Sequence, residues 1–136
     1  MRCHDFHLRG YEVRAFGAEI ILHLVDDYPP RPAEESHIRF AGIEVYHFVH
    51  SGGTIIFGID EVPLSQILDQ HWDDILHWAT GRGGVPHWDH DDRASYQAKL
   101  ETDGYRAWEI SSSIGFEGFV IAKSIEGVTD QFTQTA

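Results

Sequence analysis

The chain has 136 residues, which suits a single domain able to bury a sizeable core, and its formal net charge is −12. Such a charge disfavours binding to a phosphate backbone, because that binding depends on Lys and Arg. One cysteine, Cys3, excludes an intramolecular disulfide. The opening MRCHDFHLRG has no apolar signal region and no apolar run approaches about 18 residues. We therefore expect a cytoplasmic protein that binds neither nucleic acid nor membrane.

Two strands are predicted at the start of the chain, over residues 7 to 15 and 18 to 25. In the second of them Ile20, Leu22 and Leu24 alternate with other residues, as in a strand with one face on a core. The short Phe16-Gly17 link between them predicts a hairpin. The next segment, DDYPPRPAEES, holds three prolines and four acids, so it is predicted to be an exposed connection.

The strongest pattern lies between residues 36 and 60, SHIRFAGIEVYHFVHSGGTIIFGID. It predicts two long strands joined by a turn at Ser51-Gly52-Gly53. The bulky apolar residues change from even to odd positions after Gly42, which predicts a β-bulge at that glycine. Ile55, Phe57 and Ile59 share one apolar face, and that face must be covered.

Two helices are predicted after this segment. Between Pro63 and Thr80 the apolar residues recur at spacings of three and four, which indicates an amphipathic helix whose stripe covers the Ile59 face. The second helix is predicted from Asp89 to Asp103, with Asp89 or Asp91 as its N-cap and Gly104 closing its C-terminus.

The last strands are predicted over residues 105 to 112 and 116 to 125, followed by a polar tail that frays from about residue 127. The elements predict one α+β domain spanning residues 1–136. Its mostly antiparallel six-stranded sheet has the order ββββααββ, with one long amphipathic helix packed on one face. The oligomeric state does not follow from these patterns, although an exposed edge strand could pair two copies into a homodimer.

The negative charge is concentrated between Asp60 and Asp92, which hold eight acids and a single base, Arg82. One interpretation is a solvated face that keeps the protein soluble. The other is a surface for a basic protein, in which aromatic rings supply contact area and carboxylates supply steering. The predicted contacts are Asp69, Asp73, Asp74, Trp78 and Trp88.

An alternative function is a metal-dependent or hydrolytic enzyme centred on His87, Asp89 and His90, where nitrogen and oxygen ligands are dense. The motifs HExxH and CxxC are absent, and no EF-hand order of carboxylates occurs. Glu109 and Glu117 could pair across the last hairpin, but two carboxylates on strands are usually solvated. The leading hypothesis is therefore non-enzymatic, with no catalytic residue and no cofactor.

Two segments, FAGIEVYHF…GTIIFGIDEVPL between Phe40 and Leu64 and YRAWEISSSIGFEGFVIAKSIE between Tyr105 and Glu126, resemble a family of small, uncharacterised single-domain bacterial proteins. The resemblance rests on structural residues and implies no catalytic site. A compact acidic α+β chain also resembles the immunity proteins of bacterial toxin systems. That second resemblance implies a basic toxin as the partner and toxin neutralisation as the function.

Overall fold

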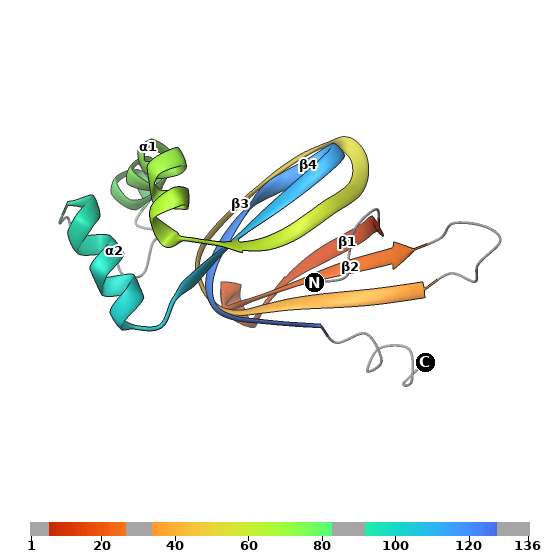
Figure 1. Cartoon of the computed structure of the whole chain (residues 1–136), viewed down its shortest axis with the longest axis horizontal. Helices are drawn as coiled ribbons and strands as arrows, with labels where there is room; N and C mark the ends of the chain where they lie inside the picture. The colour runs from red at the N-terminus through yellow and green to blue at the C-terminus, as the bar shows by residue number, and fades with distance from the viewer. Residues whose placement is uncertain (1–5, 27–33, 83–91, 128–136) are drawn as a thin grey trace.

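The computed structural model describes residues 6–26, 34–82 and 92–127 (Figure 1). The described residues form antiparallel strands and two α-helices, which confirms the α+β class. The elements are β1 (Phe6–Arg14), β2 (Glu19–Asp26), β3 (Glu34–Val62), α1 (Leu64–Arg82), α2 (Arg93–Thr102) and β4 (Arg106–Gly127), with a 3-10 turn at Ala15–Gly17. Neither described helix combines the length and the apolar character that crossing a membrane would require.

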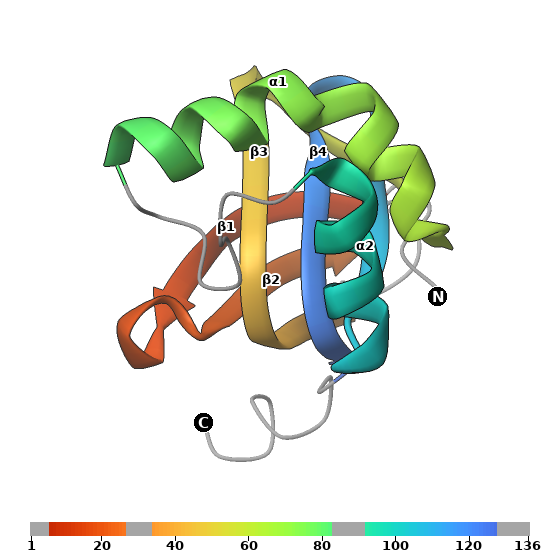
Figure 2. The ribbon, with the colours of Figure 1, turned by 90° about the vertical axis from the view of Figure 1, so that its left-hand side faces the viewer.

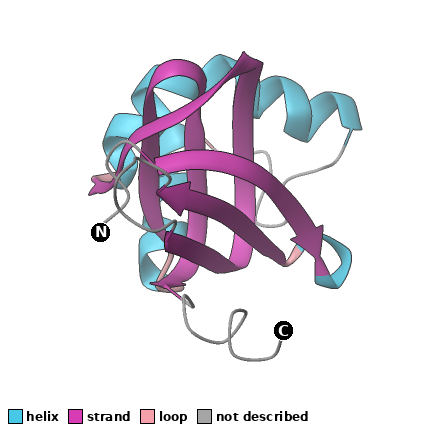
Figure 3. Ribbon diagram, turned by 90° about the vertical axis from the view of Figure 1, so that its right-hand side faces the viewer, coloured by secondary structure: helices cyan, strands magenta, loops and turns pink. Residues whose placement is uncertain are grey.

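The sheet begins with the predicted hairpin of β1 and β2, which pair antiparallel from His7↔Val25 to Arg14↔Glu19. β2 pairs in turn with the first part of β3, and β3 pairs with β4. The second half of β3 also meets the start of β1, through Phe6↔Ile56. The sheet therefore curls round until it contacts itself, and a core can form inside the curl (Figure 3).

The predicted pairing of the two halves of β3 is wrong. β3 does fold back on itself (Figure 1), but each half pairs with β4, from Ile38↔Gly127 at one end to Val62↔Ala107 at the other. At the fold β3 has four residues, 51–54, between its partnered positions, whereas β4 has only Gly115, which has a φ of +80°. β3 follows the longer, outer path of the bend, so the Ser-Gly-Gly segment serves a fold of the two-stranded ribbon.

The predicted order ββββααββ is consequently not exact. Four continuous strands make the sheet, in the order β1-β2-β3-β4. Six antiparallel strand segments result when the halves of β3 and of β4 on either side of the fold are counted separately. The two strands predicted between residues 36 and 60 are thus one long strand, β3. The two strands predicted after the helices are likewise one long strand, β4. The predicted tail after residue 127 and most of the proline-rich connection lie outside the described residues.

The irregularity predicted at Gly42 occurs slightly later in the chain. Gly42 has a φ of +68°, and its N–H donates to the carbonyl oxygen of Ala18 at 2.9 Å. The register with β4 shifts between Ile43 and Val45. Because one slipped residue reverses the side chains that follow, Ile43 packs toward the inside of the curl while Val45 lies on the opposite face.

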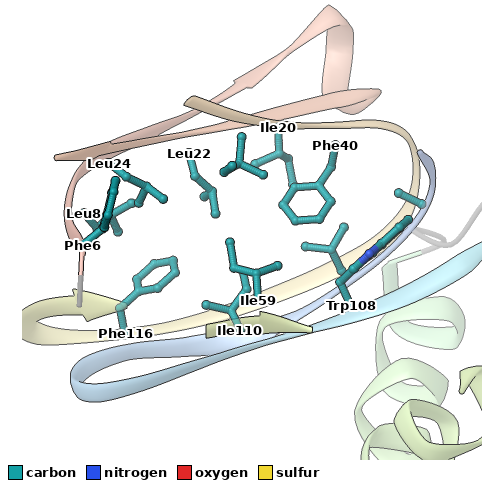
Figure 4. Packing of buried hydrophobic residues seen from close by; sticks show 13 residues of the cluster. Phe6, Leu8, Ile20, Leu22, Leu24, Phe40, Ile59, Trp108, Ile110 and Phe116 are labelled. Atoms are coloured by element: carbon teal, nitrogen blue, oxygen red, sulfur yellow. The ribbon is translucent and has the colours of Figure 1, made fainter. Parts of the chain in front are cut away.

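Two apolar clusters result, one on each face of the β3/β4 ribbon. The inner cluster fills the curl of the sheet and includes Ile20, Leu22, Phe40, Ile59 and Trp108 (Figure 4). The outer cluster lies beneath the helices and is formed by Val45, Leu64, Ile67, Leu68, Ile75, Tyr96, Leu100, Ala107, Phe119 and Ile121. Much of the ribbon is therefore buried on both faces.

Helix α1 has the predicted apolar stripe, but it covers a different surface. Ile67, Leu68 and Ile75 are fully buried, each stabilising the fold by roughly 1.5–3 kcal/mol. They pack over Val45 and Phe119 in the outer cluster, whereas Ile59 faces the inner one. The expectation that the stripe covers Ile59 is therefore wrong, and the side chains of Ile55 and Phe57 lie outside the described residues.

Helix α2 has Asp92 as its N-cap, one residue beyond Asp91 and three beyond Asp89. The Asp92 carboxylate accepts from the Ser95 N–H at 2.8 Å, whereas Asp89 and Asp91 lie outside the described residues. Gly104 closes the helix as predicted, with a φ of +84°. Figure 2 shows α1 and α2 together on the outer side of β3 and β4.

A buried carboxylate ties α2 to the sheet at the site of the register shift. Glu44 is 3% exposed, and the Tyr96 hydroxyl donates to its Oε2 at 2.7 Å. Burial and then the negative charge of Glu44 raise the pKa of Tyr96, so the hydroxyl keeps its proton and remains a donor. The contact satisfies a charged group that would be costly to bury alone.

Replacing Tyr96 with phenylalanine should lower the free energy of unfolding by about 1–3 kcal/mol, because the buried Glu44 carboxylate loses a donor. Denaturant titration followed by circular dichroism measures the change. The matched control is Tyr46→Phe, which removes a hydroxyl from a half-buried ring of the inner cluster and should cost less than about 0.5 kcal/mol. Equal losses in the two variants would contradict a specific role for the Glu44–Tyr96 contact.

Candidate binding site

The acidic residues of α1 are exposed beside its buried stripe. Asp73 and Asp74 are exposed, and within the described part of the chain neither has an ion-pair partner, whereas Ile75 beside them is fully buried. Asp69 is also exposed, but it forms an ion pair with Arg93 of α2 at 2.8 Å. The helix thus presents two uncompensated carboxylates and a third that helps to connect the helices.

Of the two tryptophans predicted as partner contacts, the structure describes Trp78 but not Trp88. Trp78 is half-buried against the outer cluster, and its ring centroid lies 5.2 Å from that of His47 on β3. Trp88 lies outside the described residues. Trp78 can therefore contribute only the exposed part of its ring to a partner, next to the carboxylates of the same helix.

The alternative metal site at His87, Asp89 and His90 falls wholly outside the described residues. Among the residues that are described, no group of three or more His, Cys, Asp and Glu side chains is arranged to hold a metal ion. This alternative stays a prediction of the sequence.

A pocket of about 330 Å³ opens between α1 and the outer face of the β3/β4 ribbon. Its walls include His47 from β3, Gln70 and His71 from α1, and Glu109, Ser111 and Glu117 from β4. The odd-numbered residues of β4 face outward on both sides of the fold, since Phe119 and Ile121 belong to the outer cluster. Glu109 and Glu117 therefore reach one pocket from opposite sides of the Gly115 bend.

The two histidines of this pocket are held by aromatic contacts. The His71 ring lies 4.5 Å from the ring of Phe119, centroid to centroid, and His47 rests against Trp78. Burial and the proximity of His47 lower the pKa of His71, and the charges of Asp74 and Glu109 oppose that shift. The lowered pKa favours the neutral form of His71, and the lining also holds the carboxylates of Glu109 and Glu117.

A second group of polar side chains lies on the outward face of β1, β2 and β3, away from the helices. His23 and His37 face each other across neighbouring strands, with their Nδ1 atoms 2.7 Å apart, and Nε2 of His23 lies 2.6 Å from Oε2 of Glu12. Arg9 and Glu35 form an ion pair at the rim of an adjoining pocket of about 310 Å³. Sequence reasoning missed this group, because only the register His23↔His37 between β2 and β3 reveals it.

The His23–His37 contact requires at least one ring to be neutral at Nδ1. A hydrogen bond between two ring nitrogens needs one N–H and one lone pair, so protonating both rings would place two donors and two positive charges together. His37 is 7% exposed, and burial followed by the charges of His23 and Arg9 lowers its pKa, while Glu35 opposes the shift. The contact is a structural one that weakens with acid.

Comparisons of the chain with protein-family models, with curated proteins and with solved structures found no match. The resemblance to immunity proteins therefore stays an expectation from the sequence, and the function is inferred from the site itself.

The stability of the fold should decrease as the pH falls below about 6.5. The pKa of His37 is lower in the folded state than in the unfolded chain, so the unfolded chain binds a proton at a higher pH. As the pH falls from 6.5 to the pKa of the folded state, proton binding therefore favours unfolding and the free energy of unfolding decreases. Denaturant titrations between pH 8 and pH 5 should show a smaller loss for His37→Asn than for the unaltered protein. His77→Asn, at an exposed position, is the control and should keep the original pH dependence.

Proposed function

We propose that this chain is a non-enzymatic, acidic binding protein that engages a basic protein through the outer side of α1. The observation that carries the proposal is the exposure of Asp73 and Asp74 on a helix whose apolar stripe, Ile67, Leu68 and Ile75, is fully buried. A helix anchored in this way holds its carboxylates in fixed positions. Because the backbone of this surface is already ordered, binding a partner would cost little conformational entropy.

The charge of the whole chain supports the same proposal. A net charge of −12 attracts a basic partner over a distance of about one Debye length and raises the rate of encounter. Asp69, Asp73 and Asp74 then lie on the surface that such a partner would reach first, with the half-buried ring of Trp78 on the same helix. Trp88 remains a proposed contact from the sequence.

Neutralisation of a basic toxin is one specific form of this function. It is supported by the charge and by the rigid acidic helix, and it would require the partner's basic residues to be part of the toxin's working surface. The proposal also includes a cytoplasmic location, as expected of a chain with a single cysteine.

The proposal is tested by capturing partners from a cell lysate, identifying a basic one, and measuring its binding as a purified protein at increasing salt. Asp73→Lys combined with Asp74→Lys should weaken the purified complex at least about tenfold, or ~1.4 kcal/mol, because two attractive charges become repulsive. Affinity should also fall as the salt concentration rises.

The control carries the same change of charge at a different place. Glu101 and Asp103 are exposed at the C-terminal end of α2, where Glu101 lies near the first residues of α1, Leu64 and Ser65. Reversing both should reduce binding much less than reversing the pair on α1. A partner that is retained regardless of salt, or that responds equally to both double variants, would show that α1 is not the binding surface.

A further inference from the structure

The pocket beside α1 has the form of a site for one side chain. Its volume of about 330 Å³ lies at the lower end of the range of roughly 300–1,000 Å³ that is usual for ligand pockets. Gln70 and His71, in the middle of α1, form one wall, and residues of β3 and β4 form the others. The pocket is therefore continuous with the helix that carries Asp73 and Asp74.

The lining has a negative charge that no described residue neutralises. Glu109 is half-buried and Glu117 is exposed, and neither forms an ion pair within residues 6–26, 34–82 and 92–127. Asp74 adds a third carboxylate close enough to influence His71. A cation entering the pocket would meet two glutamates on the strand side and a third negative charge at the helix.

Two of the lining residues, His47 and His71, contribute flat rings. His71 lies against Phe119, and His47 lies against Trp78 with an angle of 35° between the ring planes. Rings of this kind favour a planar cation over a compact one, because a guanidinium can stack on them while its N–H groups donate to carboxylates. Carboxylates and rings together match arginine better than lysine.

We propose that this pocket binds an arginine side chain, with Glu109 and Glu117 as the acceptors of its guanidinium. The inference rests on the proposed function, because it names the residue that a basic partner would insert beside α1. The exposed acids of the helix would then attract the partner, and the pocket would select for an arginine at one position.

Binding in the pocket should weaken in acid. The titratable groups that line it are His71 on α1, His47 on β3, and Glu109 and Glu117 on β4, and Asp74 lies close enough to influence His71. Burial lowers the pKa of His71, and protonation of this ring would repel the incoming cation, so binding should weaken as the pH falls below about 6.5.

The direct test uses N-acetyl-arginine amide as the probe and N-acetyl-citrulline amide, its neutral counterpart, as the comparison. Both are titrated at millimolar concentration into the ¹⁵N-labelled full chain, and amide shifts are followed by NMR. The arginine probe should shift the signals of Gln70, Ser111 and Gly118 with an affinity at least about tenfold higher than that of the citrulline probe. Lowering the pH from 7.5 to 5.5 should weaken the response.

The matched variant is Glu109→Gln combined with Glu117→Gln, which keeps the size of both side chains and removes their charge. It should abolish the preference for arginine, whereas Glu101→Gln, at an exposed position on α2 outside the pocket lining, should retain it. An unchanged melting curve of the double variant confirms that the fold is intact. Equal binding of both probes, or shifts confined to residues outside the pocket, would show that the pocket does not select arginine. The proposed function would then still be decided by the charge-reversal test on α1.

Discussion

Much of the β3/β4 ribbon is buried on both faces, and the rest of the structure depends on that burial. Its inner face packs inside the curl of the sheet, and its outer face packs beneath α1 and α2. An antiparallel sheet commonly leaves one face in water, so burying both requires apolar residues at odd and at even positions. The register shift between Ile43 and Val45 provides this arrangement, since Ile43 then belongs to one side and Val45 to the other.

The same shift explains why a carboxylate lies deep in the protein. Glu44 is the residue between Ile43 and Val45, so the irregular register turns it toward α2. There it accepts from Tyr96, which is itself fully buried in the outer cluster. A contact between a charged acceptor and a phenol is directional, unlike apolar packing, and it can fix where α2 sits on the ribbon.

The elements that local periodicity could predict were the β1–β2 hairpin, both helices and the closing role of Gly104. The fold of the ribbon could not be predicted in the same way. A Ser-Gly-Gly segment between two apolar strands is typical of a hairpin, and only the distant β4 shows that both strands have another partner. For the site, exposure of Asp73 and Asp74 followed from the stripe, whereas the approach of Glu109 to Glu117 depended on the bend at Gly115.

The position of the pocket follows from the limited part of the ribbon's outer face that α1 and α2 cover. Along the outer face of β4, Ala107, Phe119 and Ile121 lie under the helices, and the outward positions nearer the fold are Glu109, Ser111 and Glu117. Because the helices cover only part of the ribbon's outer face, the rest of that face lies beside them. Polar residues occupy that part, and because both arms of β4 reach it, two carboxylates that are eight positions apart in the sequence share one opening. The acidic side of α1 adjoins this opening, so steering and selection of a basic partner can occur on a single surface.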